Sequence, residues 1–558
     1  MKRAIIIFLI LISIAFLLRV LYIRADAPLK IVHLTNSGGI YFDEGIYPHN
    51  ARNKILFGKW VTDEWNPIIY SFILNYLYYI VFLLFGIGIV QIKMVHVVIS
   101  LFFILFFYLS ARKEFGERFG LLFSTIPAFS FVYLIYNRNG LVENVMTLLF
   151  MIAFYFFLLS LEKEKYSFWN GFFTSLAFIT KYYGIYFVIA DIVAILYAMK
   201  GRPNKKKSIL LFASGFLTTI ILWFLFIFLP FRENYLKISG GWTKLSRPPL
   251  SSPLELLSNL DRFIAFRYFS LSPVLLILGI IFVTFGIYKL IKWDIKPSHL
   301  FVLLWLLIGS AEIGILYYHP LRYFVPIYPA FFLASAYALH WIFFEDGKEK
   351  IKPLPAGITF LVLIYLLYKA QIFLLHYPKF PDILMFKFFS LKKFYASAVI
   401  YINIAIAGII LAAFLFRLIK PVKLTFAVFL FAIIPSINSL YLFNKHFLSH
   451  PEYKVEQMAD YVKTHYSRSN VFMGLEAPRI ILKTRMRVVF AYKDWYNDKN
   501  DPFRRFRVTH LVDMRKFHQL WWVKSMYPRI FKNLELEVSF PIWDTYIDIY
   551  RIKWENLK

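Results

Sequence analysis

The chain consists mainly of long apolar runs separated by short loops that carry Lys and Arg. Because the hydrocarbon core of a bilayer is about 30 Å thick, a spanning helix needs about 20 mostly apolar residues. Runs of this kind, one of them rather short, occur at Ala4–Tyr22, Ile92–Ser110, Phe119–Tyr136, Leu141–Leu161, Phe168–Thr180, Tyr183–Met199, Ile209–Leu229, Leu271–Ile291, Leu300–Tyr318, Tyr323–Phe344, Leu354–Leu375, Phe394–Leu418 and Leu424–Phe443. The pattern predicts a polytopic α-helical membrane protein.

One further apolar run, Ile68–Gly88, is also long enough to span. The basic loops decide its placement, since Lys and Arg concentrate on the cytoplasmic side of a membrane. With the N-terminus inside, a full crossing by this run would put the loops Arg112–Arg118 and Lys200–Lys207 outside. If the run lies along the outer face instead, these and the later basic loops all fall inside. We therefore predict about 13 transmembrane helices and an outer juxtamembrane segment at 68–88 in a protein of the cytoplasmic membrane.

The hydrophobic pattern changes near residue 443. Residues 1–443 form the predicted transmembrane domain, with outer loops at 24–91 and 230–270. Residues 444–558 are predicted to form a small soluble α/β domain, which lies outside after an odd number of spans. Its expected elements are helices at Pro451–Tyr466 and Phe517–Ile530 and strands at Asn470–Leu475, Arg487–Tyr492, Thr509–Met514, Glu535–Phe540 and Thr545–Ile552.

Composition agrees with a membrane protein, because 59% of the 558 residues are hydrophobic and 20% are aromatic. The formal net charge of +30 comes largely from loops between apolar runs. It therefore indicates contact with membrane lipids rather than with nucleic acid. The chain contains no Cys, which excludes disulfides and thiolate nucleophiles. It also lacks a phosphate-binding loop of the Walker type, a nucleophile elbow and a His-Glu-x-x-His metal motif.

Two adjacent carboxylates, Asp43 and Glu44, closely follow the first predicted span. An outer-facing carboxylate can act as a general base toward an acceptor hydroxyl or amine. It can also bind a divalent metal together with its neighbour, or conduct protons in a transporter. The structural alternative is a solvated acid or a helix cap, with Asp43 preceding a helix at Gly45–Phe57.

Further charged and polar residues lie at outer ends of spans or in outer loops under this topology. Cations at such positions can hold a lipid phosphate, and acids can orient them or bind a sugar hydroxyl. The structural alternatives are a turn-stabilising Arg–Glu pair, a snorkelling Lys and interfacial Arg–Tyr anchors. The residues concerned are Lys93, Arg138, Glu143, Lys181, Arg247, His319, Arg322 and Tyr323.

Several of these motifs together resemble a known family. The chain is similar to GT-C glycosyltransferases of the group that contains the protein O-mannosyltransferases and the lipid A aminoarabinose transferase. The matching pieces are Phe42-Asp43-Glu44-Gly45-Ile46-Tyr47 with Ala51-Arg52, Asn66-Pro67, Arg138 with Glu143, Lys181, and Arg322-Tyr323 followed by Pro326 and Pro329. Beyond residue 345 only the layout is similar, with a soluble outer domain after the last span.

The resemblance implies a transferase that moves a sugar, with inversion, from a polyprenyl-phosphate carrier to a lipid, protein or glycan acceptor outside the cytoplasmic membrane. It implies that Asp43 is the base or acceptor-orienting acid and that Glu44 is its catalytic partner. Arg138, Lys181 and Arg322 would hold the phosphate, and the remaining residues named above would complete the substrate site. No cofactor follows from it, and a divalent metal stays an open alternative.

The sequence departs from the family pattern at three positions: Glu143 stands where Asp is more frequent, Lys93 where Arg is frequent, and a single Pro67 replaces a double proline. Two other functions compete with the transferase. A secondary transporter or lipid or glycan flippase would place charges at the membrane midplane and show repeated halves. A non-catalytic partner in envelope assembly would not need the acid pair.

Overall fold

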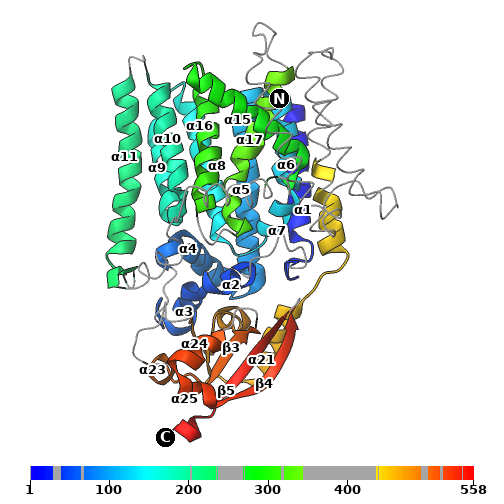
Figure 1. The fold of residues 1–558 in the computed structure, drawn as a ribbon, viewed down its shortest axis with the longest axis vertical. Helices are drawn as coiled ribbons and strands as arrows, with labels where there is room; N and C mark the ends of the chain where they lie inside the picture. Colours follow the sequence, from blue (N-terminus) through cyan, green and yellow to red (C-terminus); the bar gives the residue numbers. More distant parts are fainter. Residues whose placement is uncertain are drawn as a thin grey trace.

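The structure is a computed structural model. It describes residues 2–28, 39–63, 68–200, 204–233, 235–236, 268, 271–315, 320–343, 435–437, 439–491, 501–515, 519–542 and 545–557. Figure 1 shows a helical bundle with a small sheet-containing domain at one end of it. The runs expected to span at 354–375 and 394–418, and most of the one at 424–443, lie outside the described residues.

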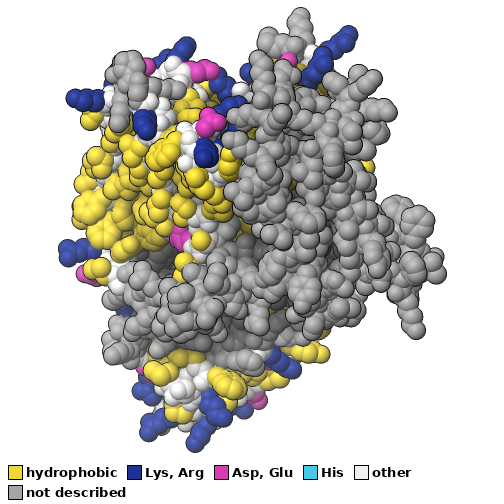
Figure 2. Space-filling model, turned by 45° about the horizontal axis from the view of Figure 1, so that its top comes forward, with side chains coloured by type: hydrophobic (Ala, Val, Ile, Leu, Met, Phe, Trp, Pro, Cys, Tyr) yellow, Lys and Arg dark blue, Asp and Glu magenta, His cyan; other side chains and the backbone are white. Residues whose placement is uncertain are grey.

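The bundle contains helices of the length and apolarity that a bilayer requires. Six described helices are long and apolar enough to cross a membrane, and shorter apolar helices accompany them. Their exposed side chains include Leu217, Ile221 and Phe226, and Figure 2 shows hydrophobic side chains over the flank of the bundle with Lys and Arg gathered toward its end. The bundle helices are α1 (Lys2–Val20), α5 (Ile89–Phe115), α6 (Glu117–Phe129), α7 (Phe131–Tyr136), α8 (Val142–Ser160), α9 (Tyr166–Thr180), α10 (Ile185–Ala198), α11 (Lys205–Trp223), α15 (Pro273–Ile291), α16 (Pro297–Ile315) and α17 (Tyr328–Phe343). The protein is therefore a multi-pass helical membrane protein.

The span expected at Phe119–Tyr136 is divided into α6 and α7. Pro127 lacks the N–H that would continue the helix, and Ser130 leaves helical geometry with φ −57° and ψ 127°. Arg19 of α1 donates to the carbonyl oxygens of Ala128 at 3.0 Å and Pro127 at 3.5 Å. The break therefore frees carbonyl groups that a buried cation from another helix satisfies.

Three helices lie across the end of the bundle where the soluble domain is found: α2 (Gly39–Ile46), α3 (His49–Phe57) and α4 (Ile68–Phe85). The apolar run at 68–88 thus lies at one end of the bundle instead of running through it. It contacts α5 there, where the Tyr78 hydroxyl lies 2.5 Å from Nε2 of His96. The prediction of one helix at Gly45–Phe57 is wrong. The helix is interrupted before Pro48, and α3 begins at His49. Asp43 is therefore inside α2 and does not cap a helix.

The tail carries a mixed five-stranded sheet of order β2-β1-β3-β5-β4. The first three strands in this order are parallel, while β5 pairs antiparallel with β3 and β4. The strands are β1 (Val471–Met473), β2 (Arg487–Val489), β3 (His510–Met514), β4 (Leu534–Ile542) and β5 (Thr545–Ile552), close to their expected positions. The helices are α21 (Lys454–His465), α22 (Ala477–Ile480), α23 (Pro502–Arg505), α24 (Gln519–Met526) and α25 (Pro528–Lys532). Pro528 divides the helix expected at Phe517–Ile530.

The tail docks on the juxtamembrane segments through buried polar contacts. Arg52 of α3 donates to the carbonyl oxygens of Leu482, Thr484 and Met486 at 3.0, 2.8 and 2.8 Å. The Asp63 carboxylate accepts from the backbone N–H of Phe490 at 2.7 Å. Leu482, Thr484 and Met486 lie between α22 and β2, and Phe490 follows β2, so the docked surface includes the segments on both sides of that strand.

Candidate active site

Helix α2 divides the acid pair between two groups of charged residues. Neighbouring residues on an α-helix point about 100° apart, as 3.6 residues per turn require. Asp43 lies with the bundle residues Glu143, Lys181 and Arg322, which we call the Asp43 group. Glu44 lies instead with Lys93 of the bundle and Arg479 of the tail, which we call the Glu44 group.

The Asp43 group is a continuous chain of ion pairs that runs from Asp43 through Arg322 and Glu143 to Lys181. Nη1 of Arg322 lies 2.9 Å from Oδ2 of Asp43, and Nε of the same guanidinium lies 3.6 Å from Oε1 of Glu143. Nζ of Lys181 donates to Oε1 of Glu143 at 2.6 Å. Glu143 opens α8, Lys181 follows α9, and Arg322 lies in the 3-10 helix η4 (Leu321–Phe324). Two acids and two cations from four separate segments therefore meet at one end of the bundle.

Burial dominates the ionisation of Asp43. It raises the pKa of this carboxyl to about 6, although the Arg322 guanidinium acts in the opposite direction, while the charge of Glu143 adds to the rise. Burial also lowers the pKa of Lys181, against the attraction of Glu143. A carboxylate with a raised pKa holds a transferred proton more readily than an exposed Asp, which suits a general base.

Two tyrosine rings form a wall beside these charges. The ring centroids of Tyr183 and Tyr323 are 4.8 Å apart, and Nζ of Lys181 lies 4.7 Å from the Tyr323 centroid and 5.1 Å from that of Tyr183. Such an arrangement places a cation against π faces.

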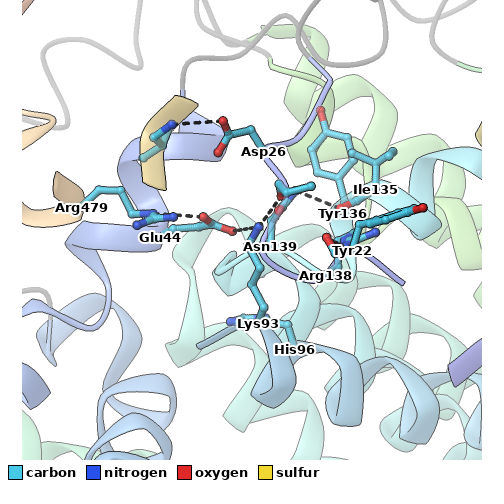
Figure 3. Close-up of polar contacts among 12 residues, drawn as sticks. Tyr22, Asp26, Glu44, Lys93, His96, Ile135, Tyr136, Arg138, Asn139 and Arg479 are labelled. Carbon is cyan, nitrogen blue, oxygen red and sulfur yellow. Dashed lines mark hydrogen bonds and ion pairs between the residues drawn. The ribbon is translucent and has the colours of Figure 1, made fainter. Parts of the chain in front are cut away.

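The Glu44 group joins the bundle, the first loop and the tail. Figure 3 shows Glu44 between Arg479 and Lys93. Nε of Arg479 donates to Oε2 of Glu44 at 3.4 Å, and Nζ of Lys93 lies 3.7 Å from Oε1. Lys93 also donates to the carbonyl of Ala25 at 2.8 Å, and Asp26 next to it accepts from the N–H of Val455 at 3.1 Å. Glu44 therefore connects three parts of the fold.

Arg138 lies on the side of the Glu44 group. Its Nη2 donates to the carbonyl oxygens of Leu21 at 2.8 Å and Tyr22 at 2.6 Å, where the loop after α1 begins. Its guanidinium lies 4.1 Å from the ring centroid of Phe447. The Arg138–Glu143 pair expected across the turn is not formed, because each residue has other partners.

The structure thus brings together five of the expected site residues: Asp43, Glu143, Lys181, Arg322 and Tyr323. Lys93 and Arg138 lie apart from them near Glu44, and Arg247 and His319 are outside the described residues. Arg479 could not be found from the sequence, since one Arg in a strongly basic chain carries no pattern of its own. Asp26 lies two residues after Arg24, in a loop whose charge the membrane topology already explains.

The metal alternative gains no support from the described part of the chain. It contains no group of three or more His, Asp and Glu side chains placed to hold a metal ion. Asp43 and Glu44 lie in different groups, and each faces cations.

The helical bundle with buried charges beside its juxtamembrane helices is the arrangement that the resemblance to GT-C glycosyltransferases implies. Residues 70–230 match the family described as dolichyl-phosphate-mannose-protein mannosyltransferase. The whole structure is similar to ArnT from Cupriavidus metallidurans bound to undecaprenyl phosphate, at 13% identity and a TM-score of 0.58 over 97% of each chain. The apo form of that protein gives 14% identity and the same TM-score and coverage.

A further solved structure, the oligosaccharyltransferase of Archaeoglobus fulgidus, matches at 13% identity and a TM-score of 0.45, over 98% of this chain and 74% of that one. No curated protein matches the sequence significantly. The family match is confined to residues 70–230, and the structural similarity shows that the chain has the fold of ArnT.

Proposed function

We propose that this protein transfers a sugar, with inversion, to a lipid, protein or glycan acceptor at the outer face of the cytoplasmic membrane, with Asp43 as the base. The observation that carries this proposal is the contact between Arg322 and Asp43 at 2.9 Å, beside the Lys181–Glu143 pair. A base and two phosphate-binding cations within one buried cluster are the parts that transfer from a phosphate carrier requires.

The transfer follows from these parts. The acceptor hydroxyl or amine gives its proton to the Asp43 carboxylate, and its lone pair forms a bond to the anomeric carbon. The bond from that carbon to the phosphate oxygen breaks on the opposite side, and its electron pair leaves with polyprenyl phosphate. Arg322 and Lys181 stabilise the negative charge that develops on the phosphate.

The charge balance of the Asp43 group gives donor binding a role in activating the base. Without a donor, the two carboxylates neutralise the two cations. An incoming phosphate competes for Arg322, while Lys181 remains held by Glu143 at 2.6 Å. Since Arg322 lowers the pKa of Asp43, its shift toward phosphate strengthens Asp43 as a base at the moment it is needed.

We also propose the topology of 13 spans, with an inside N-terminus, a transmembrane domain at 1–443 and an outside domain at 444–558. Lys93, Glu143 and Lys181 lie at the site end of α5, α8 and α9. The basic loops at 112–118 and 162–165, at the other ends of these helices, therefore lie at the far end of the bundle. That arrangement agrees with the positive-inside rule if the site faces outward.

Two further observations support the choice of donor and site. The similar ArnT structure holds undecaprenyl phosphate, a polyprenyl phosphate. The transporter alternative would place the charges needed for transport at the midplane, whereas the Asp43 group lies at the juxtamembrane end beside α2.

We keep Arg138 as a predicted contact of the donor phosphate, although in this structure it contacts the loop after α1.

The purified protein in detergent or nanodiscs, supplied with polyprenyl-phosphate hexoses and pentoses and a panel of acceptors, tests this function. We expect release of free polyprenyl phosphate with at least one donor and a product of inverted anomeric configuration by NMR. Retained configuration would contradict the single-displacement route, and no release from any donor would contradict the function.

A further inference from the structure

Arg479 is a tail residue at the membrane site. It lies in α22, which follows β1 of the soluble domain, and the residue is only 5% exposed. Its Nε donates to Oε2 of Glu44, which is 3% exposed, at 3.4 Å (Figure 3). A buried charge pair of this kind fixes the geometry of both partners, since separating them would leave a carboxylate and a guanidinium unpaired away from water.

The backbones of the two helices are also in direct contact. A Cβ placed on Gly45 of α2 would lie 2.3 Å from the backbone nitrogen of Arg479 and 2.7 Å from its Cα. Only a glycine at this position lets α22 approach α2 so closely. The contact is therefore built from both the backbone and the Glu44–Arg479 pair.

Helix α2 is too short to hold its own orientation. It has eight residues, and isolated helices shorter than about 12 residues are marginal in water. Its direction must come from tertiary contacts: Asp43 is held by Arg322 on one side, and Glu44 by Arg479 and Lys93 on the other. Loss of the tail contact would let α2 turn and carry the Asp43 carboxylate away from the acceptor.

We propose that Arg479 is a positioning residue for the transfer: through Glu44 and α2 it sets the direction of the Asp43 carboxylate. The soluble domain thus contributes to the reaction a residue that touches no reacting atom. This inference rests on the proposed function of Asp43. Under this proposal Glu44 positions α2, whereas Asp43 accepts the proton of the acceptor group.

Arg479→Gln separates positioning from donor binding. We expect kcat to fall by roughly ten- to a hundredfold, in line with the loss of one charge-assisted hydrogen bond. The KM for the donor should change by less than about threefold, because the phosphate-binding cations lie in the Asp43 group. Arg479→Lys keeps the positive charge and should therefore recover part of kcat. If Arg479 only filled space in the packing, restoring the charge would not raise kcat.

A double-variant cycle tests the link to Glu44. Glu44→Gln and Arg479→Gln should each lower kcat, and the combined variant should be no slower than the slower single one, because both remove the same contact. Arg504→Gln is the matched control, since Arg504 is an exposed tail Arg paired with Asp501. It should retain the kcat of the wild type.

Each outcome bears on one proposal. Undiminished kcat in Arg479→Gln, with an active wild type, would overturn the positioning role and leave the transferase intact. Additive losses in the double variant would also overturn it. No polyprenyl phosphate released by the wild type would instead contradict the proposed function, and the positioning role with it. If Arg479→Gln does not fold, Arg479→Lys and the Glu44→Gln rates decide: kcat equal to wild type in both overturns the role.

Discussion

At the scale of single residues, two neighbouring carboxylates differ through what surrounds them. Asp43 faces Arg322 and Lys181 of the bundle, whereas Glu44 faces Lys93 and Arg479. Their proximity in sequence suggested a joint catalytic pair, but helix geometry turns them to different partners. The proposed division of roles, a reacting Asp43 and a positioning Glu44, is thus a product of α2.

The first prediction concerns the donor cation. Arg322→Ala should raise the donor KM by roughly ten- to a hundredfold, because a charge-assisted contact to the phosphate is lost. Donor titrations of the initial rate measure this, and equilibrium binding of polyprenyl phosphate alone should weaken in parallel. A normal KM with normal phosphate binding would remove Arg322 from the donor site. Arg504→Ala serves as the control for loss of a positive charge elsewhere.

The second prediction concerns pH. Burial raises the pKa of Asp43 to about 6, and a base acts only when deprotonated. The ratio kcat/KM for the donor reports the free enzyme, so it should be constant above about pH 7 and fall about tenfold per unit well below pH 6. An acid with a raised pKa binds its proton more tightly in the folded state, so protonation of Asp43 itself does not unfold the protein. A profile that stays flat down to pH 4.5 would contradict this role.

At the scale of elements, the site depends on short pieces whose bounds the hydrophobic pattern does not define. Long spans such as α5 and α8 and strands such as β5 fall near their expected positions, because burial in lipid or in a sheet fixes their period. The segment α2 and η4 are too short to leave a periodic signal. The helix breaks at Pro48, Pro127 and Pro528 depend on which groups form hydrogen bonds with the backbone beside each proline. The hydrophobic pattern alone does not reveal those partners.

The third prediction concerns the contact between α2 and α22. Gly45→Ala should lower kcat, because the added Cβ lies 2.3 Å from the backbone nitrogen of Arg479 and pushes the two helices apart. Gly58→Ala is the control: its φ of +72° strains an added side chain, yet nothing lies within 4 Å. That variant should lose about 1 kcal/mol of stability and keep its kcat. Equal kcat values for both variants would contradict the importance of the contact.

At the scale of the whole molecule, the soluble tail is part of the membrane site. A membrane domain, a small mixed domain and the acid pair could be predicted from the sequence, as could Arg322 and Lys181 through family resemblance. The docking of the tail could not, because it depends on contacts more than 400 positions apart, such as Arg52 with Leu482 and Glu44 with Arg479. Their partners are mostly backbone carbonyls, which every sequence offers.

The fourth prediction concerns this docking. Arg52→Ala should lower the thermal unfolding midpoint and make the tail easier to cleave with trypsin. The carbonyl groups of Leu482, Thr484 and Met486 lose their buried donor, at about 1–3 kcal/mol for each that stays unpaired. Arg504→Ala, which removes an exposed cation, is the control for cleavage and stability. An unchanged midpoint together with an unchanged cleavage rate would show that the tail is held elsewhere.

The most direct test of the account is the rate of sugar transfer by Asp43→Asn at saturating polyprenyl-phosphate donor, with polyprenyl-phosphate binding measured on the same sample. Asn has nearly the same shape but cannot accept the acceptor's proton, and loss of a general base costs about 10²–10⁴-fold in rate. We predict a loss of that size with phosphate binding kept within about threefold, since Arg322 and Lys181 remain in place. Transfer at the rate of the wild type would contradict the account and move the base to another residue.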